Sequence, residues 1–422
     1  MASSSQQQEI LLASSPNTPI TAYDISTGAT LGHFIGSRSP RKGLALAGNT
    51  LIAASHISPD TTTSASIHLY NWWSSIPIHH LAVPEPVAPL ASTHDGSYLF
   101  SGGVSGYIHA LTLPSGKLLR SFPAHCKPVS CLTMNNDGSL LISGGDDGTI
   151  SVFPIIHVLD SSSVDSSTEF ALYSFHGHTS PVTCITVAGI GGCNSTIISC
   201  SADGTCKFWS LANGHHLRSV RCPCVIWSLV VDSTESNFYA GGSDGRIYVG
   251  ILKVKRRNEL VSSNINEVVA WGSGDHSGGA VTAVAMANEG RNLVSASEDG
   301  SIRVWEVENG RTVRILGDHE SGGSVSELVV ATGIRNGRRS KYGGASGIND
   351  ETGGDRELMS LGYSGREIMK SVRETIEMEE ILNVVVDDRR RSIDGLEKAI
   401  GTYERLLGLI LKEAKAADNT NV

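Results

Sequence analysis

The sequence predicts an all-β fold, a seven-bladed β-propeller, followed by a linker and a helical C-terminal tail. The prediction rests first on two stretches, His178–Trp209 and His276–Trp305, which repeat one order of short apolar runs and tight turns. A less complete copy runs from His125 to Phe153. Repeats of about 40 residues with this order are typical of propeller blades. The 46 glycines and the low share of charged residues, 18%, also favour short strands over helix bundles.

The chain divides into seven such repeats. Each is aligned on a turn between its second and third strands, where a glycine allows a tight reversal and an apolar residue then points into the blade. The predicted repeats cover residues 10–35, 42–83, 87–122, 129–175, 178–220, 225–271 and 281–316. Polar stretches lengthen two of them, at 56–66 and 160–169, and we expect these to be surface loops.

The first repeat lacks its innermost strand. It contributes only the strands Ile10–Ala13, Pro19–Ile25 and Thr30–Ile35, whereas one extra strand-like run, Ser324–Thr332, follows the seventh repeat. We expect this run to pair with the first repeat and close the ring. Closure between the chain ends removes the exposed sheet edges that a linear array would leave.

The two fullest repeats share a set of polar residues and an indole. In these residues the repeats resemble WD40 repeats, in which a His before the first strand, a Ser in the second, an Asp at the turn and a Trp in the third form a hydrogen-bonded chain inside the blade. The resemblance implies the same chain here. The two sets are His178, Ser199, Asp203 and Trp209, and His276, Ser295, Asp299 and Trp305. A third repeat keeps His125, Ser143 and Asp147, but Phe153 cannot donate a hydrogen bond as an indole would.

A Ser, a His and an Asp could instead form a catalytic triad. The set recurs from blade to blade, however, which a single active site would not do. We therefore interpret these residues as structural tetrads and predict no catalytic residues and no enzyme activity.

The eight cysteines are scattered through the repeats. Those in strand-like positions, Cys131, Cys184, Cys200 and Cys206, are expected to pack as free buried thiols. The one close pair, at 222 and 224, is separated by a single residue, which does not match the usual zinc-binding spacing. We predict no metal site and no cofactor, and the pattern suits a reducing compartment.

The formal net charge is −9, so the chain as a whole is not a basic nucleic-acid binder. Any RNA contact would be a local patch or would pass through partners. The sequence shows no long apolar run and no basic, apolar leader at its start, so we expect a soluble protein of the cytoplasm or nucleus with no membrane contact.

The density of charged residues rises near residue 333. Residues 333–422 hold 15 Lys/Arg and 16 Asp/Glu, against 18 and 26 in the 332 residues before them. We predict a propeller over 1–332, a flexible Gly/Arg/Ser-rich linker over 333–360 and a helical tail over 361–422.

The tail contains a predicted heptad seam of apolar residues. Its members step alternately by four and three residues: Leu396, Ile400, Tyr403, Leu407, Ile410 and Ala414. The helix could fold back on its own propeller, or it could pair with a partner or a second copy, the interpretation that we favour. Glycines at 395, 401 and 408 weaken the helix, so it would need a partner to order it.

Three basic groups stand out, Lys253–Arg257, Arg335–Lys341 and Arg389–Arg391. They could be ordinary solvated surface. Alternatively, they could act as nuclear-import signals or contact RNA-bearing assemblies.

Particular stretches carry a narrower resemblance. They are ILLASSPNTPITAYDISTG, HLYNWW, FPAHCKPVSCLTMNNDGSLLISGGDDGTI and WEVENGRTVRILGDHESGGSV, followed by the predicted helical tail. Together they resemble the WD repeat-containing protein 18 family of WD40 proteins, and within it the plant root-initiation-defective type. The resemblance covers essentially the full length.

The resemblance implies a non-enzymatic scaffold subunit of a nuclear complex, in the nucleolus and nucleoplasm. That complex matures the large ribosomal subunit and removes the second internal transcribed spacer from pre-rRNA. The implied partners are an α-solenoid protein, a second helical-repeat subunit and an AAA-type ATPase, with the propellers paired as a homodimer through their C-terminal helices. Propellers also serve as adaptors elsewhere, so a substrate receptor in a complex such as a ubiquitin ligase is the alternative.

Overall fold

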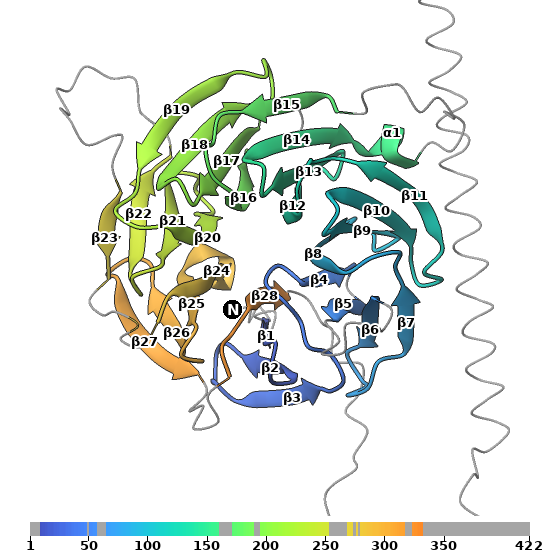
Figure 1. Ribbon diagram of the computed structural model, residues 1–422. Coiled ribbons are helices and arrows are strands. Elements are labelled where there is room, and N and C mark those ends of the chain that lie inside the picture. Colours follow the sequence, from blue (N-terminus) through green and yellow to red (C-terminus); the bar gives the residue numbers. More distant parts are fainter. Residues whose placement is uncertain are drawn as a thin grey trace, which may run out of the picture. The chain divides into compact units, whose positions relative to one another are not determined.

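The computed structural model describes residues 9–48, 50–56, 65–159, 171–189, 195–252, 268–272, 276, 279–316 and 323–331. Within this part of the chain, seven four-stranded antiparallel sheets stand around a central axis as the blades of a propeller (Figure 1). The chain divides into two units, Met1–Arg339 and Ser340–Val422, and every described residue belongs to the first. The prediction of a seven-bladed all-β propeller is confirmed.

The strands of blades 1 to 4 follow, each from the axis outward. Blade 1 consists of β28 (Glu327–Ala331), β1 (Ile10–Ser14), β2 (Ile20–Asp24) and β3 (Thr30–Phe34). Blade 2 consists of β4 (Leu44–Ala47), β5 (Leu51–His56), β6 (Ser66–Asn71) and β7 (His79–Ala82). Blade 3 consists of β8 (Val87–Ser92), β9 (Tyr98–Gly103), β10 (Tyr107–Thr112) and β11 (Leu118–Pro123). Blade 4 consists of β12 (Val129–Met134), β13 (Leu140–Gly145), β14 (Thr149–Pro154) and β15 (Tyr173–His176), with a short helix α1 (Ile155–Leu159) after β14.

Blades 5 to 7 have the same order. Blade 5 consists of β16 (Val182–Ala188), β17 (Thr196–Ser201), β18 (Thr205–Ser210) and β19 (His216–Arg221). Blade 6 consists of β20 (Ile226–Val231), β21 (Asn237–Gly242), β22 (Ile247–Ile251) and β23 (Val269–Trp271). Blade 7 consists of β24 (Val281–Ala287), β25 (Asn292–Ser297), β26 (Ile302–Glu306) and β27 (Arg311–Leu316), with a 3₁₀ turn η2 (Asn288–Gly290) after β24.

The ring closes between the two ends of the described chain. Strand β28 pairs antiparallel with β1, from Ile10 opposite Ala331 to Ser14 opposite Glu327. The hydroxyls of Ser14 and Ser326 lie 3.0 Å apart at the end of this pairing. The predicted closing strand is therefore confirmed, three residues shorter at its start than the run 324–332.

Burial explains why strands at different depths have different sequences. The second strand of blade 4, β13 (LLISGG), is buried throughout because both of its faces pack against neighbouring blades. An outer strand such as β27 (RTVRIL) alternates between exposed and partly buried residues instead. The core is therefore made of apolar layers, one between each two adjacent blades around the axis.

A loop side chain ties blades that are distant in sequence. Arg41 lies just before β4, and its guanidinium stacks 4.3 Å over the ring of Trp227 in blade 6. It also donates hydrogen bonds to the carbonyl oxygens of Trp227, at 3.1 Å, and of Thr282 in blade 7, at 3.5 Å. Nearby, the ammonium of Lys42 lies 3.3 Å from a carboxylate oxygen of Glu327 on the closing strand. These contacts brace the inner end of the ring where it closes.

Several sequence predictions fall outside the described residues. They are the linker, the helical tail with its seam, the three basic groups and the insertion at 160–169. Among the helices that are described, none is both long and apolar enough to span a bilayer.

Candidate functional site

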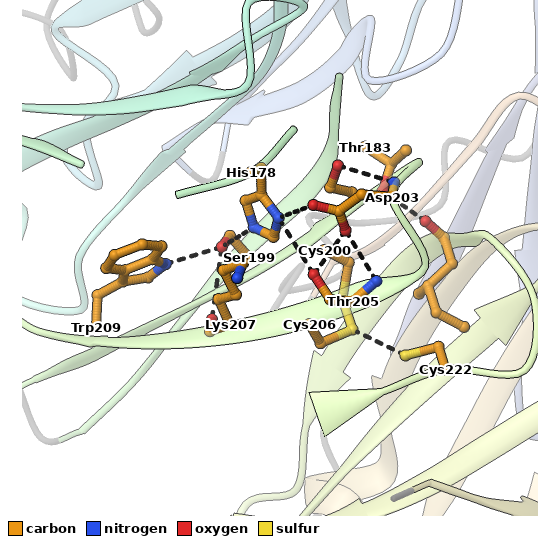
Figure 2. Close-up of a disulfide and its surroundings, with 12 residues drawn as sticks. His178, Thr183, Ser199, Cys200, Asp203, Thr205, Cys206, Lys207, Trp209 and Cys222 are labelled. Carbon is orange, nitrogen blue, oxygen red and sulfur yellow. Dashed lines mark hydrogen bonds and ion pairs between the residues drawn. A yellow bond between two sulfur atoms is a disulfide. The ribbon is translucent and has the colours of Figure 1, made fainter. Parts of the chain in front are cut away.

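Blade 5 brings its four predicted residues into one hydrogen-bonded chain (Figure 2). Nδ1 of His178 lies 2.9 Å from a carboxylate oxygen of Asp203, and Nε2 lies 2.8 Å from the hydroxyl of Ser199. The indole N–H of Trp209 donates to the same hydroxyl over 2.9 Å. The chain therefore runs from the turn after β17, through the loop before β16, to β18.

The electrostatics of this chain hold it in one protonation state. Burial lowers the pKa of His178, although Asp203 opposes that effect. Burial alone would raise the pKa of Asp203, but hydrogen bonds from Thr205 and His178 lower it below its ordinary value. A neutral imidazole and an ionised carboxylate result. In this state Nδ1–H donates to Asp203, and Nε2 is left to accept the hydroxyl proton of Ser199.

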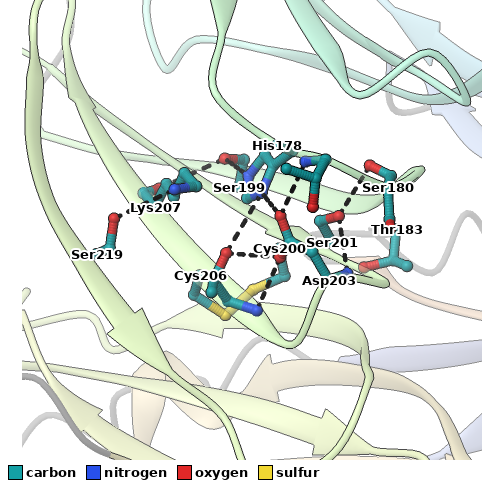
Figure 3. A network of polar contacts seen from close by, with 12 residues as sticks. His178, Ser180, Thr183, Ser199, Cys200, Ser201, Asp203, Cys206, Lys207 and Ser219 are labelled. Carbon is teal, nitrogen blue, oxygen red and sulfur yellow. Dashed lines mark hydrogen bonds and ion pairs between the residues drawn. A yellow bond between two sulfur atoms is a disulfide. The ribbon is translucent and has the colours of Figure 1, made fainter.

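The network continues past the tetrad at the turn (Figure 3). The hydroxyl of Ser201 donates to the carbonyl of Ser180 over 2.9 Å and accepts the amide N–H of Asp203 over 3.1 Å. The hydroxyl of Thr205 donates to Asp203 over 2.6 Å. The turn that carries the tetrad aspartate is thus fixed from both sides.

Blade 7 differs from blade 5 in the distance between the turn hydroxyl and the imidazole, which is 2.7 Å from Ser301 to His276 and 3.5 Å from Thr205 to His178. Its His276 and Trp305 meet the hydroxyl of Ser295 at 2.8 and 2.7 Å, as in blade 5. However, the group 2.7 Å from Nδ1 of His276 is the hydroxyl of Ser301, and Asp299 accepts the amide N–H of Ser301 over 2.8 Å. The predicted set is therefore assembled, with the hydroxyl of Ser301 beside the imidazole as the hydroxyl of Thr149 is in blade 4.

Blade 4 is intermediate between the other two. Nδ1 of His125 lies 2.8 Å from the hydroxyl of Thr149 and 3.3 Å from Asp147, while Nε2 lies 2.8 Å from Ser143. Phe153 is buried beside this chain without a donor to add. The sequence analysis did not include the hydroxyl residue that follows Asp-Gly in all three blades and lies near the imidazole. The recurring tripeptides DGT, DGT and DGS were the signal for it.

Blade 3 contains a polar chain that the sequence did not predict. Glu85, in the loop before β8, accepts the amide N–H and the hydroxyl of Ser105 at 2.8 and 2.6 Å. Its carboxylate also lies 3.0 Å from Nε2 of His109, and Nδ1 of that ring lies 2.8 Å from the hydroxyl of Ser121. The serine at the tetrad position, Ser101, is fully buried, and its hydroxyl has no partner in the structure.

Blade 6 replaces the tetrad in another way. The phenol of Tyr248 donates to Asp244 over 2.6 Å, and the thiol of Cys224 lies 3.4 Å from the same carboxylate. Gly250 stands where a Trp stands in blades 5 and 7, because a Cβ there would lie 2.2 Å from the ring of Phe238. In blade 6 the aromatic ring at this place therefore comes from Phe238 on the second strand, β21, and not from the third strand, β22.

One cysteine prediction is wrong. Cys200 and Cys206 are joined in a disulfide across β17 and β18, where the two residues are directly opposite (Figure 2). The thiol of Cys222 lies 3.5 Å from Cys206. Cys131 and Cys184 are free and buried, as expected. The spacing of six residues across a tight turn was the signal for the bond, because such a turn places its flanking residues opposite each other.

The polar side chains of the three tetrad-like sets are engaged in structural contacts. In blades 4, 5 and 7, the His, Ser and Asp side chains bond to one another within the blade and to the turn that carries them. Across the part of the chain with described placement, no three His, Cys, Asp or Glu side chains are grouped so that they could hold a metal ion.

A closed ring of seven four-stranded blades, of which blades 4, 5 and 7 carry this His–Ser–Asp set, defines a WD40-repeat β-propeller. The model of the family "WD domain, G-beta repeat" matches residues 116–153, 170–210 and 273–306, which contain the His, Ser and Asp residues of blades 4, 5 and 7. The chain belongs to the family of Protein ROOT INITIATION DEFECTIVE 3 from Arabidopsis thaliana and WD repeat-containing protein 18. It is 36% identical to the Arabidopsis protein over 307 residues, which are 73% of this chain and 68% of that protein.

More distant relatives match a similar share of the chain. WD repeat-containing protein 18 from Homo sapiens is 25% identical over 305 residues, 72% of this chain and 68% of that protein. Pre-rRNA-processing protein IPI3 from Yarrowia lipolytica is 26% identical over 318 residues, 73% of this chain and 72% of that protein. Among solved structures, the computationally designed Ika8 protein has a TM-score of 0.53 at 22% identity, over 76% of this chain and 90% of that one, a likeness of fold alone.

Proposed function

We propose that this protein is a non-enzymatic WD40 scaffold subunit of a nuclear complex that acts in pre-rRNA processing and maturation of the large ribosomal subunit. The observation that carries the proposal is the similarity, over most of the propeller, to two fungal relatives named as pre-rRNA-processing proteins. The proposed step is removal of the second internal transcribed spacer, and the proposed place is the nucleolus and nucleoplasm.

The polar chemistry of the blades supports a scaffold. In blade 5, His178, Ser199 and Trp209 are buried and Asp203 is half-buried, and these four side chains are already hydrogen-bonded to one another, so they hold the blade together. Propellers without a reactive cluster act by presenting surfaces to several partners.

The proposed partners are other protein subunits of a pre-ribosome complex. They are an α-solenoid protein, a second helical-repeat subunit and an AAA-type ATPase, as the family resemblance implies. RNA contact would be mainly indirect, because the formal net charge is −9. The seam at 396–414 would supply a homodimer contact.

Depletion of the protein from its own cells tests this proposal. Precursor rRNAs that retain the second internal transcribed spacer are expected to accumulate, and re-expression of the chain should return them to normal. Unchanged precursor levels after depletion would contradict the proposal. Purification from nuclear extract adds a second test: a stable cullin-adaptor complex without ribosome factors would favour the ubiquitin-ligase alternative.

A further inference from the structure

Three cysteines lie side by side in blade 5, and two of them form the disulfide. Cys206 is on β18, and Cys200 lies directly opposite it on β17. On the other side of Cys206, the thiol of Cys222 lies 3.5 Å from its sulfur (Figure 2). The sulfur of Cys206 therefore contacts two other cysteine sulfurs, one bonded to it and one free.

The position of Cys222 follows from the strand register and is fixed by the backbone. Val220 on β19 is opposite Cys206, and Cys222 is two residues further along, which in an extended chain places it on the same face. The amide N–H of Cys222 donates over 2.9 Å to the carbonyl oxygen of Gly204, in the turn between the two bonded cysteines. A free thiol is thus held in contact with the Cys206 sulfur of the disulfide.

The three cysteines differ in their access to solvent. Cys200 and Cys206 are both 0% exposed and lie within the apolar layer between blades 5 and 6. Cys222 packs against this layer and is only half-buried. A dissolved thiol therefore cannot reach the disulfide in the folded blade, but it can reach Cys222.

We propose that Cys222 is a thiol-exchange site through which small dissolved thiols reduce the buried disulfide. In the first step, the Cys222 thiolate attacks the sulfur of Cys206. A bond between positions 206 and 222 forms, the bond between positions 200 and 206 breaks, and Cys200 leaves as a thiolate that takes up a proton. The number of disulfides is unchanged, but the bond now includes a sulfur that solvent reaches.

A dissolved thiol then completes the reduction. Its thiolate attacks the sulfur of Cys222 and forms a mixed disulfide there, while Cys206 leaves as a thiolate and is protonated. A second dissolved thiol releases Cys222 from the mixed disulfide. In sum, one protein disulfide and two small thiols become two protein thiols and one small-molecule disulfide. The same steps in reverse re-form the bond, with the small-molecule disulfide as the oxidant.

The surroundings of Cys222 make the first step slow at neutral pH. Burial raises the pKa of its thiol to about 12, and Cys224, Cys184 and Asp203 act in the same direction. The attacking thiolate is therefore scarce, and the rate is expected to rise about tenfold for each pH unit below that pKa. The contact between the two sulfurs offsets this scarcity, because the attack is intramolecular.

The rate of reduction of the full chain tests the proposal. Protein oxidised with glutathione disulfide is mixed with reduced glutathione, and free thiols are alkylated at intervals for mass spectrometry. Cys222→Ser is expected to slow the loss of the bond by at least about tenfold, because the bond then opens only when the blade itself opens. Cys224→Ser is the matched control, a free half-buried cysteine two residues away, and is expected to react at the wild-type rate.

Cys200→Ser traps the product of the first step. Glutathione disulfide is expected to join the remaining Cys206 and Cys222. Trypsin cleaves after Lys207 and Arg221, so this bond links two peptides, whereas the bond between positions 200 and 206 stays within one.

Three results would overturn the proposal. They are equal reduction rates for the wild type and Cys222→Ser, a Cys200→Ser protein in which the two peptides are not linked, and a wild type in which glutathione disulfide does not join Cys200 to Cys206. Damage to the fold cannot imitate the expected result, because a loosened blade would expose the disulfide and speed its reduction.

Discussion

Removing the hydroxyl of Ser199 is the most direct test of the tetrad in blade 5. Ser199→Ala leaves two buried groups without partners, the indole N–H of Trp209 and Nε2 of His178, which now meet that hydroxyl at 2.9 and 2.8 Å. Each buried unsatisfied group costs about 1–3 kcal/mol, so we expect a loss of about 2–4 kcal/mol. With about 2 cal/mol/K of unfolding entropy per residue over the propeller, this corresponds to a Tm lower by about 3–6 °C.

Blade 3 provides the control. Ser101 occupies the same strand position and is equally buried, but its hydroxyl has no partner in the structure. Ser101→Ala removes an unsatisfied polar atom, so we expect the Tm to stay the same or to rise slightly. Thermal unfolding followed by circular dichroism measures both variants. Equal losses for Ser199→Ala and Ser101→Ala would refute the view that the hydrogen-bonded chain, rather than the serine itself, stabilises the blade.

The remaining predictions concern pH, closure, packing and the disulfide. Because burial lowers the pKa of His178, the neutral imidazole stabilises the fold fully above the unfolded-state pKa of about 6.5, and this stabilisation is lost as the pH falls below that value. Equal Tm values at pH 7.5 and pH 5.5 would contradict this. Deleting Glu327–Ala331 removes a whole strand from blade 1 and is expected to abolish the cooperative thermal transition, which calorimetry would detect. Gly250→Ala places a Cβ 2.2 Å from the ring of Phe238, so overpacking of about 1–3 kcal/mol should appear as a lower urea midpoint. A thiol reductant or Cys200→Ala opens a short loop and should cost about 2 kcal/mol, and a Tm insensitive to both would count against a bond in solution.

The sequence was a good guide to residues that recur. Repetition of His, Ser, Asp and Trp at fixed spacing located the tetrads of blades 5 and 7, and the missing strand of the first repeat located the closing strand. It was a poor guide where a blade departs from the repeat. Nothing in the spacing of Glu85 and His109 pointed to their contact in blade 3, because that contact depends on how the loop before β8 folds over the sheet.

The chain by itself determined the count of blades, the closure of the ring and the strands that are buried, because each follows from local patterns that every blade repeats. Only the tertiary structure decided which polar atoms meet. The contact of the Ser301 hydroxyl with His276, the bond between Cys200 and Cys206, and the stacking of Arg41 over Trp227 all depend on strand register or on contacts between blades far apart in sequence. The sequence of a repeat determines the strands of its own sheet. The distances between side chains also depend on how neighbouring sheets pack, and a hydrogen bond forms only within a few tenths of an ångström of its preferred donor–acceptor distance.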